Sequence, residues 1–460
     1  MLKYKIFDRS FYKRTYFLLW NIKFSMREKF IKSTLILLVG GAITKVLGML
    51  IKIITNRLIG PEGIGLYMLI LPTFILFINV SQLGMPTALV KIIAEDKKNN
   101  RNLFFSIVLI VLLFNLFLII VILLGANFLS LRLLHNKDAV VAILAIALVI
   151  PFTSISSICR SYFLGKEMMW PHIISNIVED IVRLVLIICF TPFFLRKGTK
   201  YAVCFLILCN VISETASILI LFLFLPKNLR IKRSDFKPNK IYIKECLDIG
   251  LPNTTGRFIS SIGYFLEPII LTNSLLLCGY NKDFIIREYG ILSGYAMPLI
   301  LLPSFFTMAI SQALLPVIAK KYSDREISSV RNKIKQAIFF SLIIGLVWTI
   351  ILFNGNEILL KFIYNTNLGG SYIKFLGPVC LLQYIQAPLS AALDAMGESK
   401  DIMMSAILGV IVRSILTFVL AFLHIGIWGL IMAISANILV VTFYQASRVR
   451  KHLKEKELYI

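Results

Sequence analysis

Two lysines lie inside a stretch of the chain that is otherwise apolar enough to cross a lipid bilayer. The stretch covers residues 40–57 and reads GGAITKVLGMLIKIITNR, with Lys45 nearer the middle of the predicted span and Lys52 two turns further on. A charged side chain is costly inside a bilayer, so something other than lipid must face it. Two ammonium groups in such a place would attract an anion, because a low dielectric amplifies their field.

The polar residues of this stretch share one side of the predicted helix. At about 100° per residue, Lys45 and Lys52 fall within roughly a third of the circumference, together with the small and polar residues around them. Residues 253–268 carry a similar stripe that includes Arg257. The two stripes predict the walls of a water-filled central cavity. The predicted cavity residues are Lys45, Lys52, Asn56, Asn253, Arg257, Tyr264 and Glu267.

Each of these cations also has an alternative interpretation. Lys52 lies about 10 Å from the end of its helix at 1.5 Å per residue, so its ammonium group can reach the headgroups, and Lys45 can do so over a greater distance. Arg257 can pair with an acid in the core, either Glu267 or Glu214. The glycines of the stripes can simply let helices pack closely.

Other charges inside the predicted spans indicate structural ion pairs. Glu179 and Arg183 stand four residues apart, the spacing at which two side chains meet on one face of a helix. Glu214 lies on a polar face of the next span and is predicted to meet this pair. Arg160 and Arg413 are expected to pair locally. Such pairs would hold a bundle together rather than contact a substrate.

The composition predicts an all-α polytopic membrane protein. Of the 460 residues, 58% are hydrophobic and only 16% are charged, with a mean hydropathy of +0.83. A soluble domain would carry more charge, and the apolar windows are too long for the alternating strands of a barrel. About twelve spans are predicted, at roughly 33–57, 65–92, 103–126, 138–161, 171–193, 201–225, 243–275, 290–319, 335–354, 371–395, 402–423 and 425–447.

Two segments of the first half recur in the same order in the second half. At a shift of 225 residues Gly65 falls on Gly290, and a later segment that ends in Ile-Val-Arg at Arg183 resembles one that ends at Arg413. The repeats predict two six-helix pseudo-symmetric lobes with a substrate path between them. The predicted domains are a basic N-terminal segment 1–32, an N-lobe 33–225, a basic linker 226–242, a C-lobe 243–447 and a basic tail 448–460.

The charges of the predicted loops indicate an orientation. Loops that follow even-numbered spans hold clusters of Lys and Arg, as in 227–240 and 320–335, whereas loops after odd-numbered spans are poorer in base except at 196–200. The positive-inside rule therefore predicts a cell-membrane protein with both termini in the cytoplasm. The net charge of +25 is mostly this topology signal, so binding of nucleic acid is not expected.

The N-terminus and the metal-ligating residue types carry weaker signals. Residues 1–25 lack a small-residue cleavage site, so they either form an amphipathic cytoplasmic segment or precede a true start at Met26. The seven cysteines and four histidines show no ligand spacing, so no disulfide framework, metal site or cofactor is predicted. A coupling ion of unknown identity, bound at Glu267 beside the cations, is left open.

Three segments resemble a known family of transporters. They read KFIKSTLILLVGGAITKVLGMLIKIITNRLIGPEGIGLYMLILP, SQLGMPTALVKIIAE and RSYFLGKEMMWPHIISNIVEDIVR. They resemble the stage V sporulation protein B-like branch of polysaccharide exporters, in the multidrug/oligosaccharidyl-lipid/polysaccharide flippase superfamily. The resemblance covers essentially all of residues 26–450. Many members of the family have fourteen spans, so a C-terminal pair is expected to be absent here.

The resemblance implies an alternating-access flippase and not an enzyme. The implied cargo is a lipid-linked pyrophosphate oligosaccharide or peptidoglycan precursor, used in cell-wall or spore-cortex synthesis during sporulation. Related lipid II flippases have a cationic central cavity, a position that Lys45, Lys52 and Arg257 would occupy. The implied partners are this lipid-linked glycan, membrane lipids and wall-synthesis enzymes.

Other classes of protein remain as alternatives. A drug or organic-cation antiporter of the same fold should present carboxylates in its cavity, and the first predicted span has none. An enzyme acting on lipid-linked sugars would need a metal-binding or catalytic motif or a large outer loop, and no such feature is found. A non-transporting scaffold for wall-synthesis enzymes would leave the cations inside the membrane without a purpose.

Overall fold

The computed structural model describes residues 26–95, 100–224 and 240–458, and for residues 26–38, 100, 251–254, 256 and 458 it describes the backbone alone. Within these ranges the chain is helical and has no strand. The predicted N-terminal segment and the linker therefore lie mostly outside the described residues. The helices are α2 (Met26–Ser81), α3 (Met85–Ala94), α4 (Asn100–Asn127), α5 (Ala139–Gly165), α6 (Met169–Lys197), α7 (Thr199–Leu223), α8 (Lys240–Leu277), α9 (Lys282–Gly290), α10 (Met297–Ile300), α11 (Ser304–Ser323), α12 (Ile327–Tyr364), α13 (Gly370–Met396), α14 (Ser399–Ala421) and α15 (Trp428–Leu458), with π-helical segments η1 (Phe128–Leu133) and η3 (Ile291–Ala296).

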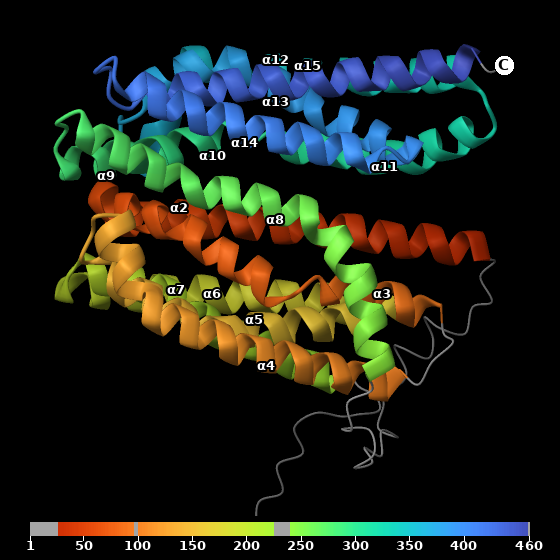
Figure 1. Cartoon of the computed structure of the whole chain (residues 1–460), viewed down its shortest axis with the longest axis horizontal. Coiled ribbons are helices and arrows are strands. Elements are labelled where there is room, and N and C mark those ends of the chain that lie inside the picture. Colours follow the sequence, from red (N-terminus) through yellow and green to blue (C-terminus); the bar gives the residue numbers. More distant parts are fainter. Residues whose placement is uncertain (1–25, 96–99, 225–239, 459–460) are drawn as a thin grey trace, which may run out of the picture.

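The helices run nearly parallel to one another in two groups (Figure 1). The N-terminal group holds α3 to α7 and the C-terminal group holds α9 to α15. Helix α2 lies between the two groups, and α8 crosses from one group to the other. The start of α2 and the end of α15 lie at the same end of the molecule, which we call the termini side; the other end is called the far side. This arrangement is an all-α membrane bundle.

The first predicted pair of spans is one helix with a sharp reversal. Gly60 has φ 66° and ψ −179°, a backbone conformation that is essentially restricted to glycine, and there α2 turns back toward the termini side. The predicted span 65–92 is in turn broken between α2 and α3. Leu83 and Gly84 have φ of 50° and 69° at this break, and Pro86 stands in the first turn of α3.

The number of apolar helices agrees with about twelve spans. In the part of the chain that the structure describes, nine helices are long and apolar enough to cross a membrane, or ten if the bent pair 282–300 and 304–323 is one span. That count takes residues 39–94 as one helix although the chain reverses at Gly60, and α6 carries charges that lower its hydropathy. The predicted tenth span, 371–395, agrees with α13 within one residue at each end.

Large apolar side chains cover the outside of the bundle. Leu124, Leu223 and Phe362 are each more than three-quarters exposed, and many more leucine, isoleucine and phenylalanine residues of α4, α12 and α14 are at least half exposed. Exposed apolar area on this scale is not stable in water and matches a hydrocarbon environment. The chain is therefore a multi-pass membrane protein.

Helix α2 contacts the group α9 to α15 closely on the far side. The Asn56 amide donates a hydrogen bond to the carbonyl oxygen of Gly294 at 2.5 Å, and the Arg57 guanidinium donates to the carbonyl of Ile363 at 2.5 Å and to that of Phe362. The backbones of Gly65 and Gly290 also cross there, because a Cβ atom added to Gly290 would lie 2.5 Å from the Cα of Gly65. These contacts join α2 to α9, η3 and α12.

The beginning of α8 packs against α3 and α4, in the group α3 to α7. Cys246 is fully buried in a core with Met85, Leu89 and Leu103, which come from α3 and α4. A Cβ atom added to Gly250 would lie 2.8 Å from the carbonyl oxygen of Gly84. The later part of α8 packs against α14, so this one helix contacts both groups (Figure 1).

Candidate substrate-binding site

A cavity of about 780 Å³ lies between α2, α8 and the α13–α14 connection. Ile75 and Asn79 of α2 line one wall, α8 lines a second, and residues 394–406 line a third. Residues 394–400 stand on the termini side, at the rim. The polar lining residues are Asn79, Arg257, Ser260, Ser261, Tyr264, Asp394, Ser399 and Lys400.

Helix α8 aims its polar residues into this cavity because of their spacing. Ser261 and Tyr264 follow Arg257 by four and seven residues, which places all three on one face of the helix. The Ser261 hydroxyl donates to the carbonyl oxygen of Arg257 at 2.6 Å and accepts from the Asn79 amide at 2.7 Å. The Arg257 side chain is exposed to the cavity, and no carboxylate of the described residues forms an ion pair with it.

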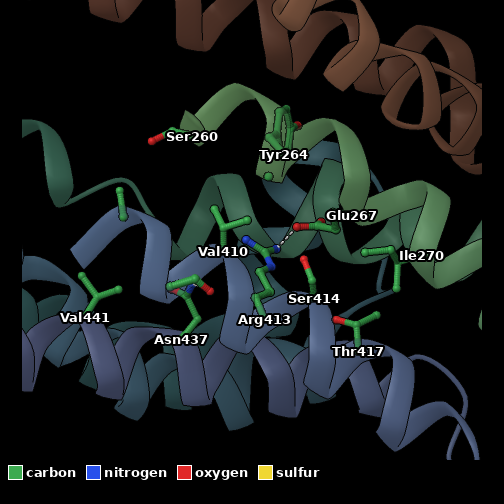
Figure 2. A pocket seen from close by; sticks show the side chains of 13 residues that line it. Ser260, Tyr264, Glu267, Ile270, Val410, Arg413, Ser414, Thr417, Asn437 and Val441 are labelled. Carbon is green, nitrogen blue, oxygen red and sulfur yellow. Dashed lines mark hydrogen bonds and ion pairs between the residues drawn. The ribbon is translucent and has the colours of Figure 1, made fainter. Parts of the chain in front are cut away.

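A smaller pocket of about 200 Å³ continues from the cavity into the C-terminal group of helices (Figure 2). Both spaces share Ser260, Tyr264 and Ala406 as lining residues. At the inner wall, Arg413 of α14 forms an ion pair with Glu267 of α8. The Glu267 carboxylate also accepts a hydrogen bond from the Tyr289 hydroxyl at 3.2 Å and is almost fully buried.

The position of Glu267 corrects one sequence-based expectation. Glu267 was expected beside Lys45, Lys52 and Arg257, but its counter-charge is Arg413. Ten residues of helix separate Glu267 from Arg257, a rise of about 15 Å. Arg413 lies on the opposite wall of the pocket and forms the ion pair with Glu267, whereas Arg257 lines the large cavity.

We expect the two partners of this pair to differ in their effect on stability. Arg413→Gln should destabilise the protein by roughly 3–5 kcal/mol, because it leaves a carboxylate of which only 4% is exposed without a counter-charge. Glu267→Gln should cost less, since Arg413 is 28% exposed to the pocket and keeps some hydration. Thermal unfolding of the purified protein in detergent checks the order, and the double variant should be more stable than Arg413→Gln alone.

Lys45 and Lys52 lie on a face of α2 that is not covered by other helices. Both side chains are exposed, and a Cβ atom added to Gly41 or Gly48 would meet no atom within 4 Å. The exposed apolar residues of the same segment lie on a different face, centred roughly 160° away at 100° per residue. These residues are Val39, Ile43, Val46 and Leu50. The lysines therefore do not share the apolar face of the helix.

Two other predicted cavity residues have different surroundings. Asn56 is buried, and its amide is used in the far-side contact with Gly294, so its side chain does not face an open space. The side chain of Asn253 lies outside the described residues. Of the predicted set, Arg257 and Tyr264 line the large cavity, Tyr264 and Glu267 line the small pocket, and Lys45 and Lys52 stand on the open face of α2.

Five charged residues of α5, α6 and α7 form one largely buried network. Arg160 of α5 pairs with Glu179 of α6 and with Glu214 of α7, the latter at 2.7 Å. Arg183 pairs with the other oxygen of Glu179 and lies 3.8 Å from Asp180. The network therefore joins three helices, and its charges pair with one another, whereas Arg257 faces the cavity.

Some functional residues had no signal in the sequence. Asn79 and Lys400 lie far from Arg257 in the chain, and only the folded arrangement brings them to one cavity. Arg413 was expected to pair locally, but its partner Glu267 is 146 residues away. The periodicity of the sequence predicts the polar face of α8. It carries no information on contacts between helices that are distant in the chain.

The comparisons with known proteins agree with this architecture. Residues 30–322 match the model of the family described as "Polysaccharide biosynthesis protein", and residues 292–419 match the family described as "MatE". The chain is 34% identical to stage V sporulation protein B of Bacillus subtilis over 93% of this chain and 85% of that protein. It is 22% identical to the lipid II flippase MurJ of the same organism, over 93% of this chain and 84% of that protein.

Solved structures show the same fold. An inward-facing multidrug resistance transporter of the MATE family and MOP superfamily aligns with a TM-score of 0.74 at 16% identity, over 90% of this chain and 95% of that chain. A MOP superfamily transporter from Pyrococcus furiosus, described as having a binding pocket of reverse polarity, aligns with a TM-score of 0.63 at 16% identity, over 93% of this chain and 96% of that chain.

The class of protein follows from these findings. The fold and the relatives place the chain among multi-pass membrane transporters and not among enzymes. Within that class, the chain belongs to the polysaccharide biosynthesis protein family that includes stage V sporulation protein B.

Proposed function

We propose that this protein is an alternating-access flippase that moves a lipid-linked pyrophosphate oligosaccharide or peptidoglycan precursor to the outer leaflet of the cytoplasmic membrane. The observation that carries the proposal is the division of the charges. Acids and bases inside the two groups of helices pair with each other, whereas Lys45, Lys52 and Arg257 are exposed and have no carboxylate partner among the described residues. Such cations are retained where an anion must be bound.

The chemistry of this cargo suits the cavity. A pyrophosphate is a concentrated anion, and Arg can bind it in a bidentate manner while Lys acts as a point charge. The hydroxyl and amide groups of Ser260, Ser261 and Asn79 offer hydrogen bonds to a sugar. The polyprenyl tail would stay in the lipid while the headgroup crosses between the lobes. Named relatives support this proposal, since one of them is a lipid II flippase.

The orientation of the cavity fits uptake from inside the cell. We infer from the basic loops that both termini lie in the cytoplasm, so the termini side would be the inner side. The rim residues Asp394 and Lys400 stand on that side, while the far side is closed by the contacts of Asn56 and Arg57. The cavity in this state would accept a headgroup from the inner leaflet, and wall-synthesis enzymes would use it on the outer side.

Complementation tests the proposal. The full chain is expressed in bacteria whose own lipid II flippase can be switched off, and plating efficiency is measured after the switch. The parent should restore growth, and Lys45→Ala and Arg257→Ala should each lower plating efficiency at least tenfold, because each removes about 1.4 kcal/mol or more of anion binding. Membrane abundance of each variant is measured by immunoblot.

The controls separate charge from folding. Lys361→Ala removes an exposed lysine from the last turn of α12, away from the cavity, and should rescue like the parent. Lys45→Arg keeps the charge and should retain most of the activity. If the alanine variants insert and rescue as well as the parent, the lysines reach the headgroups and the cavity proposal is wrong. A parent that inserts without rescue would mean a different lipid-linked glycan as cargo.

The same assay separates the two alternatives. An organic-cation antiporter would raise the tolerance of the host to cationic dyes, and its cavity would need unpaired acids. Asp394, at the rim, is the one carboxylate among the polar lining residues of the large cavity within the described chain, and it accepts a hydrogen bond from Ser399 at 3.1 Å. A non-transporting scaffold would restore growth in none of the variants, the parent included, because it moves no lipid-linked glycan. Neither result is expected.

A further inference from the structure

A histidine and three carboxylates meet on the termini side, outside the cavity. His452 lies near the end of α15, Glu398 and Asp401 lie at the start of α14, and Glu455 follows one turn after His452. No metal-ligand spacing is visible here in the sequence, because the two helix ends are about fifty residues apart in the chain and meet only in the fold.

The two nitrogen atoms of His452 have different surroundings. Nε2 lies 2.7 Å from Asp401 Oδ2, a hydrogen-bond distance. Nδ1 lies 3.6 Å from Glu398 Oε1 and 3.6 Å from Glu455 Oε2, too far for a hydrogen bond to either. An imidazole whose one N–H is fixed by a carboxylate has its other nitrogen lone pair directed outward, which is the usual arrangement of a histidine that binds a metal ion.

The 3.6 Å separations fit a bound cation. Ligand atoms at 2.0–2.2 Å from a tetrahedral Zn²⁺ stand about 3.4 Å from one another. A cation bound to Nδ1 and to the carboxylate oxygen of either Glu398 or Glu455 would therefore need only small side-chain movements. Glu398 and Glu455 are 38% and 47% exposed, so water could complete the coordination and the ion could enter from solvent.

The local charge also favours a cation in spite of the basic surface. Lys451 lies 3.6 Å from Glu455 Oε1 and Arg448 lies 3.4 Å from Asp401 Oδ1, so both bases contact carboxylate oxygens that the ion would not need. The three carboxylates around His452 outnumber these two bases.

We propose that His452 Nδ1, Glu398 and Glu455 form a binding site for a first-row divalent cation such as Zn²⁺, with Asp401 as the positioning residue that holds the imidazole. One nitrogen and two carboxylate oxygens are ligands suited to such ions, whereas Mg²⁺ prefers oxygen alone. Glu398 immediately precedes Ser399 and Lys400, which line the rim of the cavity. A bound ion would therefore tie this rim to α15. The proposal does not depend on the proposed function.

Zinc titration of the purified full chain tests the site. The protein is prepared with an affinity tag that contains no histidine, treated with EDTA and titrated with Zn²⁺ alone by calorimetry. We expect one Zn²⁺ per chain, a Kd raised at least tenfold in His452→Asn and in Glu398→Gln, and a Kd raised 10- to 100-fold in Asp401→Asn with the stoichiometry retained.

A matched histidine provides the control. His424 lies on the opposite end of the C-terminal bundle and its Nδ1 contacts only a backbone carbonyl, so His424→Asn should bind Zn²⁺ like the parent. Circular dichroism and gel filtration show whether each variant is folded, and Glu398→Gln provides a test if His452→Asn is not. If the parent binds no Zn²⁺ below about 1 mM, or if folded His452→Asn and Glu398→Gln bind like the parent, the proposal is wrong.

Discussion

Arg160→Ala is expected to destabilise the protein by roughly 3–5 kcal/mol, more than any other single charge removal in the N-terminal group of helices. Arg160 is only 17% exposed and pairs with both Glu179 and Glu214. It also donates hydrogen bonds to Ser156 at 2.7 Å and to Ser217 at 3.0 Å. Its removal would leave Glu179 with Arg183 as its remaining base and would take from Glu214 the arginine with which it pairs.

Thermal unfolding in detergent, followed by loss of the monodisperse species on heating, measures this effect. Arg196→Ala is the matched control, since Arg196 is exposed in the last turn of α6, and its effect should stay within about 0.5 kcal/mol. Adding Glu214→Gln to Arg160→Ala should restore part of the loss, because it removes the carboxylate that lost its partner. If Arg160→Ala is as stable as Arg196→Ala, the ion-pair network contributes little to the stability with which α5, α6 and α7 pack together.

The network also shows how far sequence reasoning reaches. Glu179 and Arg183 stand one turn apart on a single helix, so their contact follows from helix geometry alone. Arg160 approaches from α5, and no local pattern places it between Glu179 and Glu214. The same holds for Glu267, whose partner depends on how α14 packs against α8.

The ends of the helices could likewise be predicted only where local residues mark them. The span α13, which has a glycine cap at each end, was placed within one residue at both ends. The span limits do not mark the breaks at Leu83–Gly84 and at Leu301–Pro303, whereas the prolines at 86 and 303 predict a break near each of them. Glycine and proline at these points, together with packing against neighbouring helices, decide where the helix stops. The cavity lies where α2, α8, α13 and α14 meet, so its polar faces could be predicted from the sequence but the meeting of these helices could not.

The predicted repeat gains physical meaning from Gly65 and Gly290. These two glycines were aligned from the sequence as equivalent positions of the two halves, and in the structure their backbones touch on the far side. Equivalent residues of two halves meet each other where a pseudo-symmetry axis passes between them. The contact thus lies at the point about which the two halves would rock.

Gly290→Ala is expected to open this far-side contact. The added methyl group would lie 2.5 Å from the Cα and 2.6 Å from the nitrogen of Gly65, and backbone atoms cannot move aside as a flexible side chain can. Alanine itself favours a helix more than glycine does, so a destabilising effect would come from the crossing alone. Overpacking of this kind costs typically 1–3 kcal/mol, which would raise amide exchange of residues 55–70 and 284–300 about tenfold.

Hydrogen exchange with mass spectrometry on the purified protein measures this opening, and the complementation assay measures its consequence for transport. Gly125→Ala and Gly355→Ala are matched controls, because a Cβ atom there meets nothing within 4 Å, and both should exchange and rescue like the parent. Gly65→Ala should reproduce Gly290→Ala, since its methyl group would lie 2.5 Å from the carbonyl oxygen of Ile286. Unchanged exchange in both variants would mean that the far-side crossing yields without separating the lobes, and that the alternation of access depends on the contacts of Asn56 and Arg57 instead.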